Sequence, residues 1–125
     1  MLIRSRVTLA LTALLPLSVS CKDIVCAGVG APGVSVTVVD SLTDAPATAG
    51  ATLLVYDLDH GGVRVDSVTG QADAQTLDGA INRTGRFSVA VRKTGYRDWT
   101  KADVAVRDSC PHITTAILTA RLARP

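Results

Sequence analysis

Alternation of apolar and polar side chains is the dominant pattern of the chain from residue 34 onward. In the run 34–40, Val34, Val36 and Val38 share one face, which is the period of a strand with one buried side. The run 85–93 alternates most clearly of all. Its expected inward residues are Phe87, Val89 and Val91, and its expected outward residues are Arg86, Ser88, Ala90 and Arg92. Further strands are expected at 51–57, 63–68, 104–106 and 113–122, with a short one at 74–77.

Turn signals and composition agree with an all-β fold. The stretch 59–62 (Asp-His-Gly-Gly) is typical of a hairpin turn between 51–57 and 63–68. The run 113–122 has apolar residues on both faces, which indicates a central or bulged strand. Aromatic residues make up only 3% of the chain, so the core must be aliphatic. The sequence therefore predicts a single antiparallel β-sandwich of about seven strands over residues 34–123.

The first twenty residues have the parts of a secretory signal peptide. Arg4 and Arg6 form a short basic start, residues 7–17 are mostly apolar, and small residues precede Cys21. The apolar run contains Pro16 and is shorter than the roughly 20 residues that a membrane-spanning helix needs. We therefore expect residues 1–20 to be a signal peptide helix that is removed on export.

The stretch 17–21 (Leu-Ser-Val-Ser-Cys) resembles the bacterial lipobox, in which a small residue precedes a cysteine that receives diacylglycerol and becomes the mature N-terminus. Ser18 stands where the lipobox usually has an aliphatic residue, and Ser18 with Ser20 also suits ordinary signal peptidase. Cleavage by either pathway makes Cys21 the first residue of the mature protein. We favour the lipoprotein pathway, in which Cys21 is lipidated and the protein binds the membrane through its lipid. Lipoproteins that are retained at the inner membrane often carry aspartate directly after the lipidated cysteine, where this chain has Lys22. We therefore expect the protein to be anchored to the outer membrane, on its periplasmic or surface face.

Three cysteines leave one over after any pair, and lipidation of Cys21 accounts for it. Cys26 precedes the first expected strand and Cys110 precedes the last, so a disulfide between them would join the entry of the domain to its exit. In the loop-entropy description, closing a loop of about 85 residues stabilises a fold by about 4–5 kcal/mol. The glycine-rich residues 21–33 are expected to form a flexible, lipid-anchored tether.

The charge of the chain argues against nucleic acid as a partner. The formal net charge of +2 includes Arg4 and Arg6, and loss of the leader would leave eleven basic and eleven acidic residues. These charges are scattered, with neither a basic stripe nor an aromatic platform among them. Such a surface has no concentrated positive charge that could neutralise a phosphate backbone, so we expect no binding of nucleic acid.

The second half of the chain carries a recognisable order of elements. A Gly-x-Phe strand from Gly85 is followed by a Gly-Tyr corner, the run 104–106 and a final aliphatic strand. This order resembles the carboxypeptidase regulatory-like domains, a transthyretin-like (prealbumin-like) group of β-sandwiches. Its most specific residues here are Gly85, Phe87, Gly95 and Tyr96. The resemblance covers residues 34–122 and implies a transthyretin-like or immunoglobulin-like sandwich without fixing a role for it.

The stretch 96–99 is the first candidate for a binding surface, because it holds two of the four aromatic residues of the chain. Its candidate contact residues are Tyr96, Arg97 and Trp99. The favoured interpretation is structural: the tyrosine packs against the core with its hydroxyl on a backbone carbonyl, and Trp99 covers the sandwich edge.

A second candidate is the predicted hairpin tip, where Asp57, Asp59 and His60 could coordinate a cation. Calcium loops need more oxygen ligands at tighter spacing, and hairpin tips are commonly polar because they are hydrated. We therefore expect neither a metal nor any other cofactor.

No nucleophile motif such as Gly-x-Ser-x-Gly occurs, so we expect no catalytic activity. A transthyretin-like hydrolase would need His60 and His112 together with an arginine in a polar pocket. The expected function is that of a cell-envelope lipoprotein with a structural or protein-interaction module, whose partners are other envelope proteins or glycans. The alternative is a surface module that binds carbohydrate or peptide, which requires exposed aromatic residues in a groove or an open sheet edge.

Overall fold

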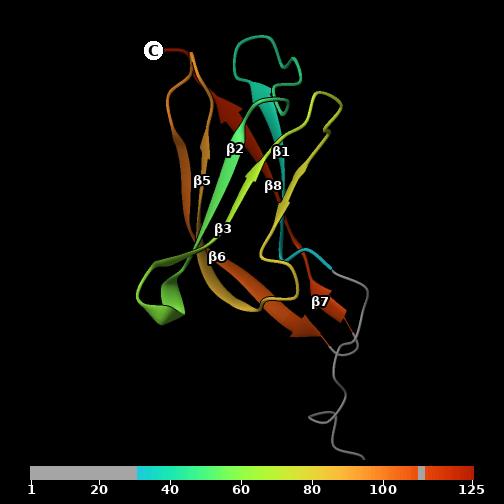
Figure 1. Cartoon of the computed structure of the whole chain (residues 1–125), viewed down its shortest axis with the longest axis vertical. Coiled ribbons are helices and arrows are strands. Elements are labelled where there is room, and N and C mark those ends of the chain that lie inside the picture. Colours follow the sequence, from blue (N-terminus) through green and yellow to red (C-terminus); the bar gives the residue numbers. More distant parts are fainter. Residues whose placement is uncertain (1–30, 110–111) are drawn as a thin grey trace, which may run out of the picture.

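Two β-sheets packed face to face form the part of the chain that the computed structural model describes, residues 31–109 and 112–125 (Figure 1). The strands are β1 (Val34–Asp40), β2 (Thr52–Asp57), β3 (Val63–Thr69), β4 (Leu77–Gly79), β5 (Gly85–Arg92), β6 (Trp99–Ser109), β7 (His112–Thr114) and β8 (Ala116–Leu122). A short 3-10 turn, η2 (Leu58–His60), joins β2 to β3. One sheet has the order β4-β1-β8 and the other the order β3-β2-β5-β6-β7. The predicted all-β sandwich is confirmed.

One strand pair differs from the predicted antiparallel arrangement. β1 and β8 are parallel over their whole length, from Val34 opposite Ala116 to Asp40 opposite Leu122. The chain changes sheets just before this pair, because β7 pairs with β6 in the five-stranded sheet whereas β8, one residue later, pairs with β1. That change of sheet, rather than a hairpin, brings β8 alongside β1 in the same direction.

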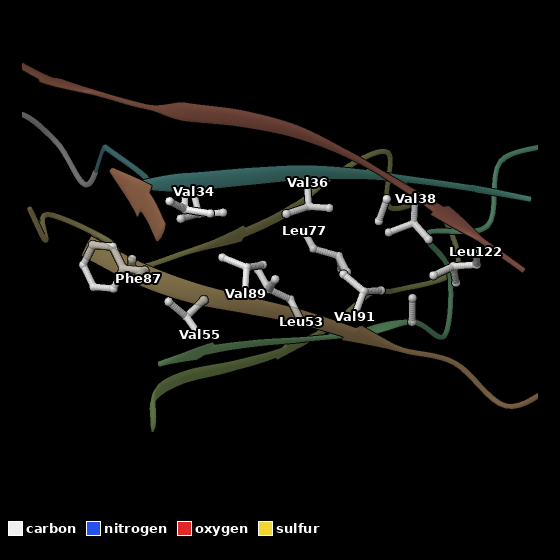
Figure 2. Packing of buried hydrophobic residues seen from close by; sticks show 14 of the residues in the cluster. Val34, Val36, Val38, Leu53, Val55, Leu77, Phe87, Val89, Val91 and Leu122 are labelled. Atoms are coloured by element: carbon white, nitrogen blue, oxygen red, sulfur yellow. The ribbon is translucent and has the colours of Figure 1, made fainter. Parts of the chain in front are cut away.

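The core lies between the two sheets and follows the predicted alternation. β1 buries every second residue, and its three inward valines face the inward residues of β2 and β5 across the sandwich (Figure 2). The largest fully buried apolar side chains are Phe87, Leu53, Leu77, Leu122, Val34, Val36, Val38, Val55, Val89 and Val91. Phe87 is the only phenylalanine of the chain and the largest of them. The predicted inward face of β5 is confirmed.

The outer face of β5 is less exposed than the sequence predicts. Ala90 was expected to face solvent, yet it is buried, because β5 is the middle strand of its sheet. Its cross-strand neighbours are Leu54 on β2, also buried, and Thr100 on β6. A small side chain between two neighbouring strands is covered even on a hydrated face.

β6 is much longer than the predicted run 104–106. The strand contains a bulge: Val104 pairs with Phe87 and Lys101 pairs with Val89, so two residues of β6 stand opposite the single residue between them on β5. Asp103, in the bulge, has a positive φ of 56°. A bulge shifts the alternation by one residue, and the strand therefore lacks a continuous period of two.

β8 lies at an edge of the three-stranded sheet, so the expectation of a central or bulged strand is wrong. The run 113–122 is divided at Thr115 into β7 and β8. Its mixed apolar pattern arises because β8 combines inward residues with Ile117, which is 81% exposed on the outer face.

Gly70, after β3, is a position where only glycine fits. Its N–H donates to the carbonyl of Ala51 (2.9 Å), its carbonyl accepts from the N–H of Gly50 (3.0 Å), and a Cβ would lie 2.2 Å from the carbonyl oxygen of Thr48. We expect Gly70→Ala to destabilise the domain by about 1–3 kcal/mol, because backbone must move to admit the methyl group. Urea unfolding followed by circular dichroism measures the loss.

Gly50→Ala is the matched control for this substitution. Gly50 has a positive φ of 77° but no atom within 4 Å of a Cβ, so an alanine there meets backbone strain without a collision. We expect a smaller loss than at Gly70. A Gly70→Ala protein as stable as the Gly50→Ala protein would contradict the close approach to Thr48.

Candidate functional site

Three segments meet at one end of the sandwich, which we name the distal end: residues 41–46 after β1, residues 93–98 between β5 and β6, and residues 123–125 after β8. Figure 1 places all three at the end opposite to the start of β1. The parallel pairing of β1 and β8 makes both strands finish there, and the N–H of Ser41 donates to the carbonyl of Leu122 (2.9 Å). The corner joins them through the N–H of Arg97, which donates to the carbonyl of Ala123 (2.8 Å).

Asp40 is the centre of the distal end. It is 3% exposed, and its carboxylate accepts four hydrogen bonds. Oδ1 accepts from the backbone N–H groups of Leu42 (2.9 Å) and Thr43 (3.1 Å). Oδ2 accepts from the hydroxyl of Tyr96 (2.9 Å) and from Nε of Arg124 (3.3 Å). One side chain thus fixes the turn after β1, the corner and the C-terminal residues to one another.

These bonds favour the charged form of the carboxylate. The backbone N–H of Leu42, then the hydroxyl of Tyr96 and the N–H of Thr43, hold the pKa of Asp40 far below its ordinary value of 3.8. Burial opposes this shift, and the bond from Arg124 adds to it. In return, the hydrogen bond to Asp40 raises the pKa of Arg124.

Two cations lie close to the ring of Tyr96. Nζ of Lys93 lies 5.9 Å and Cζ of Arg124 5.5 Å from the ring centroid, within the range of cation–π attraction. The same Nζ donates to the carbonyl of Ala47 (3.0 Å), so Lys93 also ties the corner to the segment after β1. Gly95, with a φ of 87°, provides the tight turn that lets this corner form.

The sequence-predicted surface residues Tyr96, Arg97 and Trp99 are therefore unequal in exposure. Tyr96 and Trp99 are half-buried and pack against the core, whereas Arg97 is exposed. The tyrosine hydroxyl was expected on a backbone carbonyl, but its acceptor is the carboxylate of Asp40. The corner contributes to the fold through both aromatic side chains and presents Arg97 to solvent.

At the hairpin tip, the acidic residues are engaged within the protein. Asp57 accepts from the N–H of Asp59 (3.0 Å) at Oδ1, and its Oδ2 lies 2.8 Å from Nδ1 of His60. The carboxylate of Asp59 accepts from the backbone N–H of Arg86 (3.0 Å) and from Nε of its guanidinium (3.3 Å). The backbone N–H of Arg86 is the main cause that lowers the pKa of Asp59. The tip is fixed against β5 by these bonds.

No group of three or more metal-binding side chains converges in the part of the chain that the structure describes. The two histidines named for a hydrolase also lie on separate elements: His60 is in η2, between β2 and β3, and His112 begins β7 at the other edge of the same sheet. Within residues 31–109 and 112–125, no helix has the length and apolar character needed to cross a membrane. The predictions for residues 1–20, Cys21, Cys26 and Cys110 fall outside the described residues.

The most exposed large apolar side chain of the described residues is at the distal end. Leu42 is 83% exposed, on the turn that follows Asp40. This turn is tied down by the N–H of Asp44, which donates to the carbonyl of Asp40 (2.9 Å), and by Arg121, whose guanidinium contacts the carboxylate of Asp44. The alternation pattern could not single out Leu42, because a leucine in a turn gives no periodic signal.

No protein-family model matches the chain, and no curated protein sequence matches it.

Proposed function

We propose that the chain is a cell-envelope lipoprotein whose β-sandwich is a non-catalytic protein-interaction module, held at the membrane through Cys21. The leader, the lipobox-like stretch before Cys21 and the parity of the cysteines support export and anchoring. The relation to carboxypeptidase regulatory-like domains is part of this proposal and depends on the Gly85–Phe87 strand and the Gly95–Tyr96 corner. A β-sandwich by itself is compatible with many families.

The observation that carries the interaction role is the rigid presentation of Leu42. The apolar surface of an exposed leucine is removed from water when a partner covers it, which favours binding. The turn that carries Leu42 is already fixed by Asp40 and Arg121, so it loses little conformational entropy when a partner binds. Arg97 is exposed in the neighbouring segment of the same end, so a partner with an apolar pocket and an acidic group beside it fits this surface.

The alternative, a module that binds carbohydrate or peptide through exposed aromatic residues, receives less support. It requires the ring of Trp99 to be free, whereas this ring packs against the core. Arg97 beside it is exposed, but none of the four aromatic residues is: Phe87 is buried, and Tyr56, Tyr96 and Trp99 are half-buried.

Two measurements test the proposal. The intact mass of the protein extracted from membranes is expected to include diacylglycerol, and Cys21→Ser is expected to remove this mass. The same spectrum reports the loss of two hydrogen atoms that a Cys26–Cys110 disulfide would cause. An unlipidated wild-type protein would refute the anchor.

The interaction surface is tested by photocrosslinking in the native cell envelope. A photoreactive benzoylphenylalanine in place of Leu42 is expected to give an adduct of one discrete size, which Arg97→Glu weakens. The same residue in place of Val63, which is 61% exposed at the start of β3 and lies at the opposite end of the sandwich, is the control and is expected to give none. Equal adducts at both positions, or none at Leu42, would refute the distal end as the interaction surface.

A further inference from the structure

β8 has one backbone edge bonded and one edge open. The N–H of Ala116 donates to the carbonyl of Gly33 (2.8 Å), and the carbonyl of Leu122 accepts from Ser41 (2.9 Å), so residues of even number in β8 face β1. Backbone groups of successive strand residues point to opposite sides. The N–H and C=O groups of residues 117, 119 and 121 therefore point away from β1, and the sheet order gives β8 no second neighbour among the described strands.

This open edge lacks the features that usually protect one. β8 is a regular run of seven residues with neither proline nor lysine, and its only charge, Arg121, is paired with Asp44. Ile117 is 81% exposed beside the open edge. By contrast, the edge strand β3 meets β2 through an irregular register between Val55 and Tyr56, which disturbs pairing. Long, regular and apolar edges are templates for strand addition.

We propose that β8 pairs antiparallel with β8 of a second copy of this chain, with Thr119 opposite the partner subunit's Thr119 on a two-fold axis. The two three-stranded sheets then become one six-stranded sheet. In this register the three residues with open backbone groups face the three of the partner, so six hydrogen bonds form. The partner is a copy of the chain because the strand is complementary to itself, on both faces.

On the outer face, Ile117 stands opposite the partner's Arg121, whose aliphatic stem covers it, and the two Thr119 side chains form a favourable cross-strand pair. On the inner face, Leu118 stands opposite the partner's Ala120. Leu118 is half-buried although it packs against the core, because no other described strand lies beside it at the open edge. A large side chain thus meets a small one, and the second strand supplies the missing cover.

Other registers fit less well. A slide of one residue places the open N–H and C=O groups of the odd-numbered residues opposite even-numbered residues, whose backbone groups are bonded to β1. A slide of two residues keeps odd-numbered residues opposite one another but leaves two such pairs within the two β8 strands, so four hydrogen bonds form instead of six. A slide of four residues in one direction brings the two Arg121 side chains face to face, which is repulsive, and in the other direction it places Arg121 opposite the partner's Ile113, in β7, where the chain has already moved to the other sheet.

The pair is expected to be reversible, because the edges of two seven-residue strands bury less surface than the roughly 1,200 Å² of a stable interface. The two-fold axis is perpendicular to the shared sheet. The two copies of β1 therefore begin at the same height along this axis, on the same side of the dimer. If the proposed anchor at Cys21 is correct, confinement to one membrane raises the effective concentration of the two copies. The pairing itself does not depend on the anchor.

Disulfide trapping tests the register. In the proposed pair the two Cα atoms of residue 119 are about 5.5 Å apart, a distance that a disulfide spans. Under mild oxidation, Thr119→Cys in the full chain is expected to give a homodimer whose linking peptide pair, identified by mass spectrometry, contains position 119 twice. Ile117→Cys is the control on the same strand, because its two copies would lie more than about 12 Å apart. Ser67→Cys is the control on the edge of β3.

Charge substitution tests the pairing without a covalent bond. Ile117→Lys places a cation opposite the partner's Arg121, whereas Ile117→Glu places a carboxylate there. In sedimentation equilibrium we expect the lysine variant to dimerise at least tenfold more weakly than the glutamate variant. The same comparison in the Cys21→Ser background separates failure of this pairing from failure of the anchor.

Equal dimerisation of the two charge variants would overturn the proposal, because a strand pair in this register must distinguish a cation from a carboxylate opposite the partner's Arg121. Trapping of Ile117→Cys or Ser67→Cys as readily as Thr119→Cys would overturn it as well. A wild-type chain that stays monomeric at the highest soluble concentration, with no trapped dimer of Thr119→Cys, would show that the open edge is not used by a second copy.

Discussion

Replacing Phe87 with alanine is expected to destabilise the domain by about 3–5 kcal/mol. Phe87 is the largest of the fully buried side chains, and it comes from β5, the middle strand of the five-stranded sheet. Its ring lies between the sheets at one end of the row of buried valines (Figure 2). Because the other core residues of the row are aliphatic and already in contact, they cannot expand into the space that the ring would leave.

Such a loss is a large part of the stability of a domain of this size, which is typically about 5–15 kcal/mol. Urea unfolding followed by circular dichroism measures it. Phe87→Leu keeps most of the buried volume and is expected to fall between the wild type and the alanine variant. Leu42→Ala, at the most exposed leucine, is the matched control and should change the free energy of unfolding by no more than about 0.5 kcal/mol. Equal effects at positions 87 and 42 would contradict the packing described here.

The strands that the sequence predicted well are those in which one face is buried and the other hydrated without interruption. β1, β2, β3 and β5 agree with the predicted runs to within one residue at each end. Their alternation is a local property, so the residues of one strand suffice to reveal it. The buried face of β5, with Phe87 and Val89, follows directly from this period.

The elements that sequence reasoning missed depend on contacts between distant segments. The bulge at Asp103 breaks the period of two in β6, and the change of sheet after β7 sets the parallel direction of β8. Neither event leaves a periodic signal, because each is decided by which other strand lies alongside. The same holds for the short β4, expected at 74–77 but found at Leu77–Gly79, where its three residues pair with β1.

The candidate site was predicted only in part for the same reason. Tyr96 was predicted as a candidate because it is one of the few aromatic residues. Its partner Asp40, however, is distant in sequence from both Tyr96 and Arg124. Asp40 and Tyr96 are 56 residues apart, and Asp40 and Arg124 are 84 apart. A local signal for Asp40 did exist, since an aspartate that ends a strand often accepts from the N–H groups of the next turn.

Replacement of Asp40 is expected to have the second-largest effect, through the loss of hydrogen bonds rather than of packing. Asp40→Ala removes the acceptor of four bonds and leaves the hydroxyl of Tyr96 and the N–H groups of the turn without it. A buried donor that loses its acceptor destabilises the folded state more than an exposed donor does, because water can replace the lost acceptor only at the exposed donor. We expect a lower urea midpoint at pH 7, with a larger change than for Asp98→Ala, whose exposed carboxylate forms an ion pair with Arg92.

The pH dependence of stability provides a sharper test of the same carboxylate. In the folded protein the pKa of Asp40 is held far below 3.8, the ordinary value that it regains on unfolding. Above about pH 4 the group is charged in both states, so its full stabilisation is present. As the pH falls below about 4, the unfolded chain takes up the proton first, and the stabilisation is lost progressively toward the lower pKa of the folded state. The wild type is therefore expected to lose stability in acid.

Asp40→Asn removes this titration while keeping a side chain of nearly the same size. We expect the variant to be less stable than the wild type at pH 7 and to depend less on pH between about 4 and 2, so that the two urea midpoints converge in acid. Some dependence should remain, because the pKa of Asp59 is also lowered by its bonds to Arg86. Asp98→Asn removes one exposed carboxylate that is ion-paired with Arg92 and is the control for the loss of one negative charge. Parallel pH profiles of the wild type and Asp40→Asn would mean that Asp40 does not fix the distal end through its charge, and the rigid presentation of Leu42 would then need another cause.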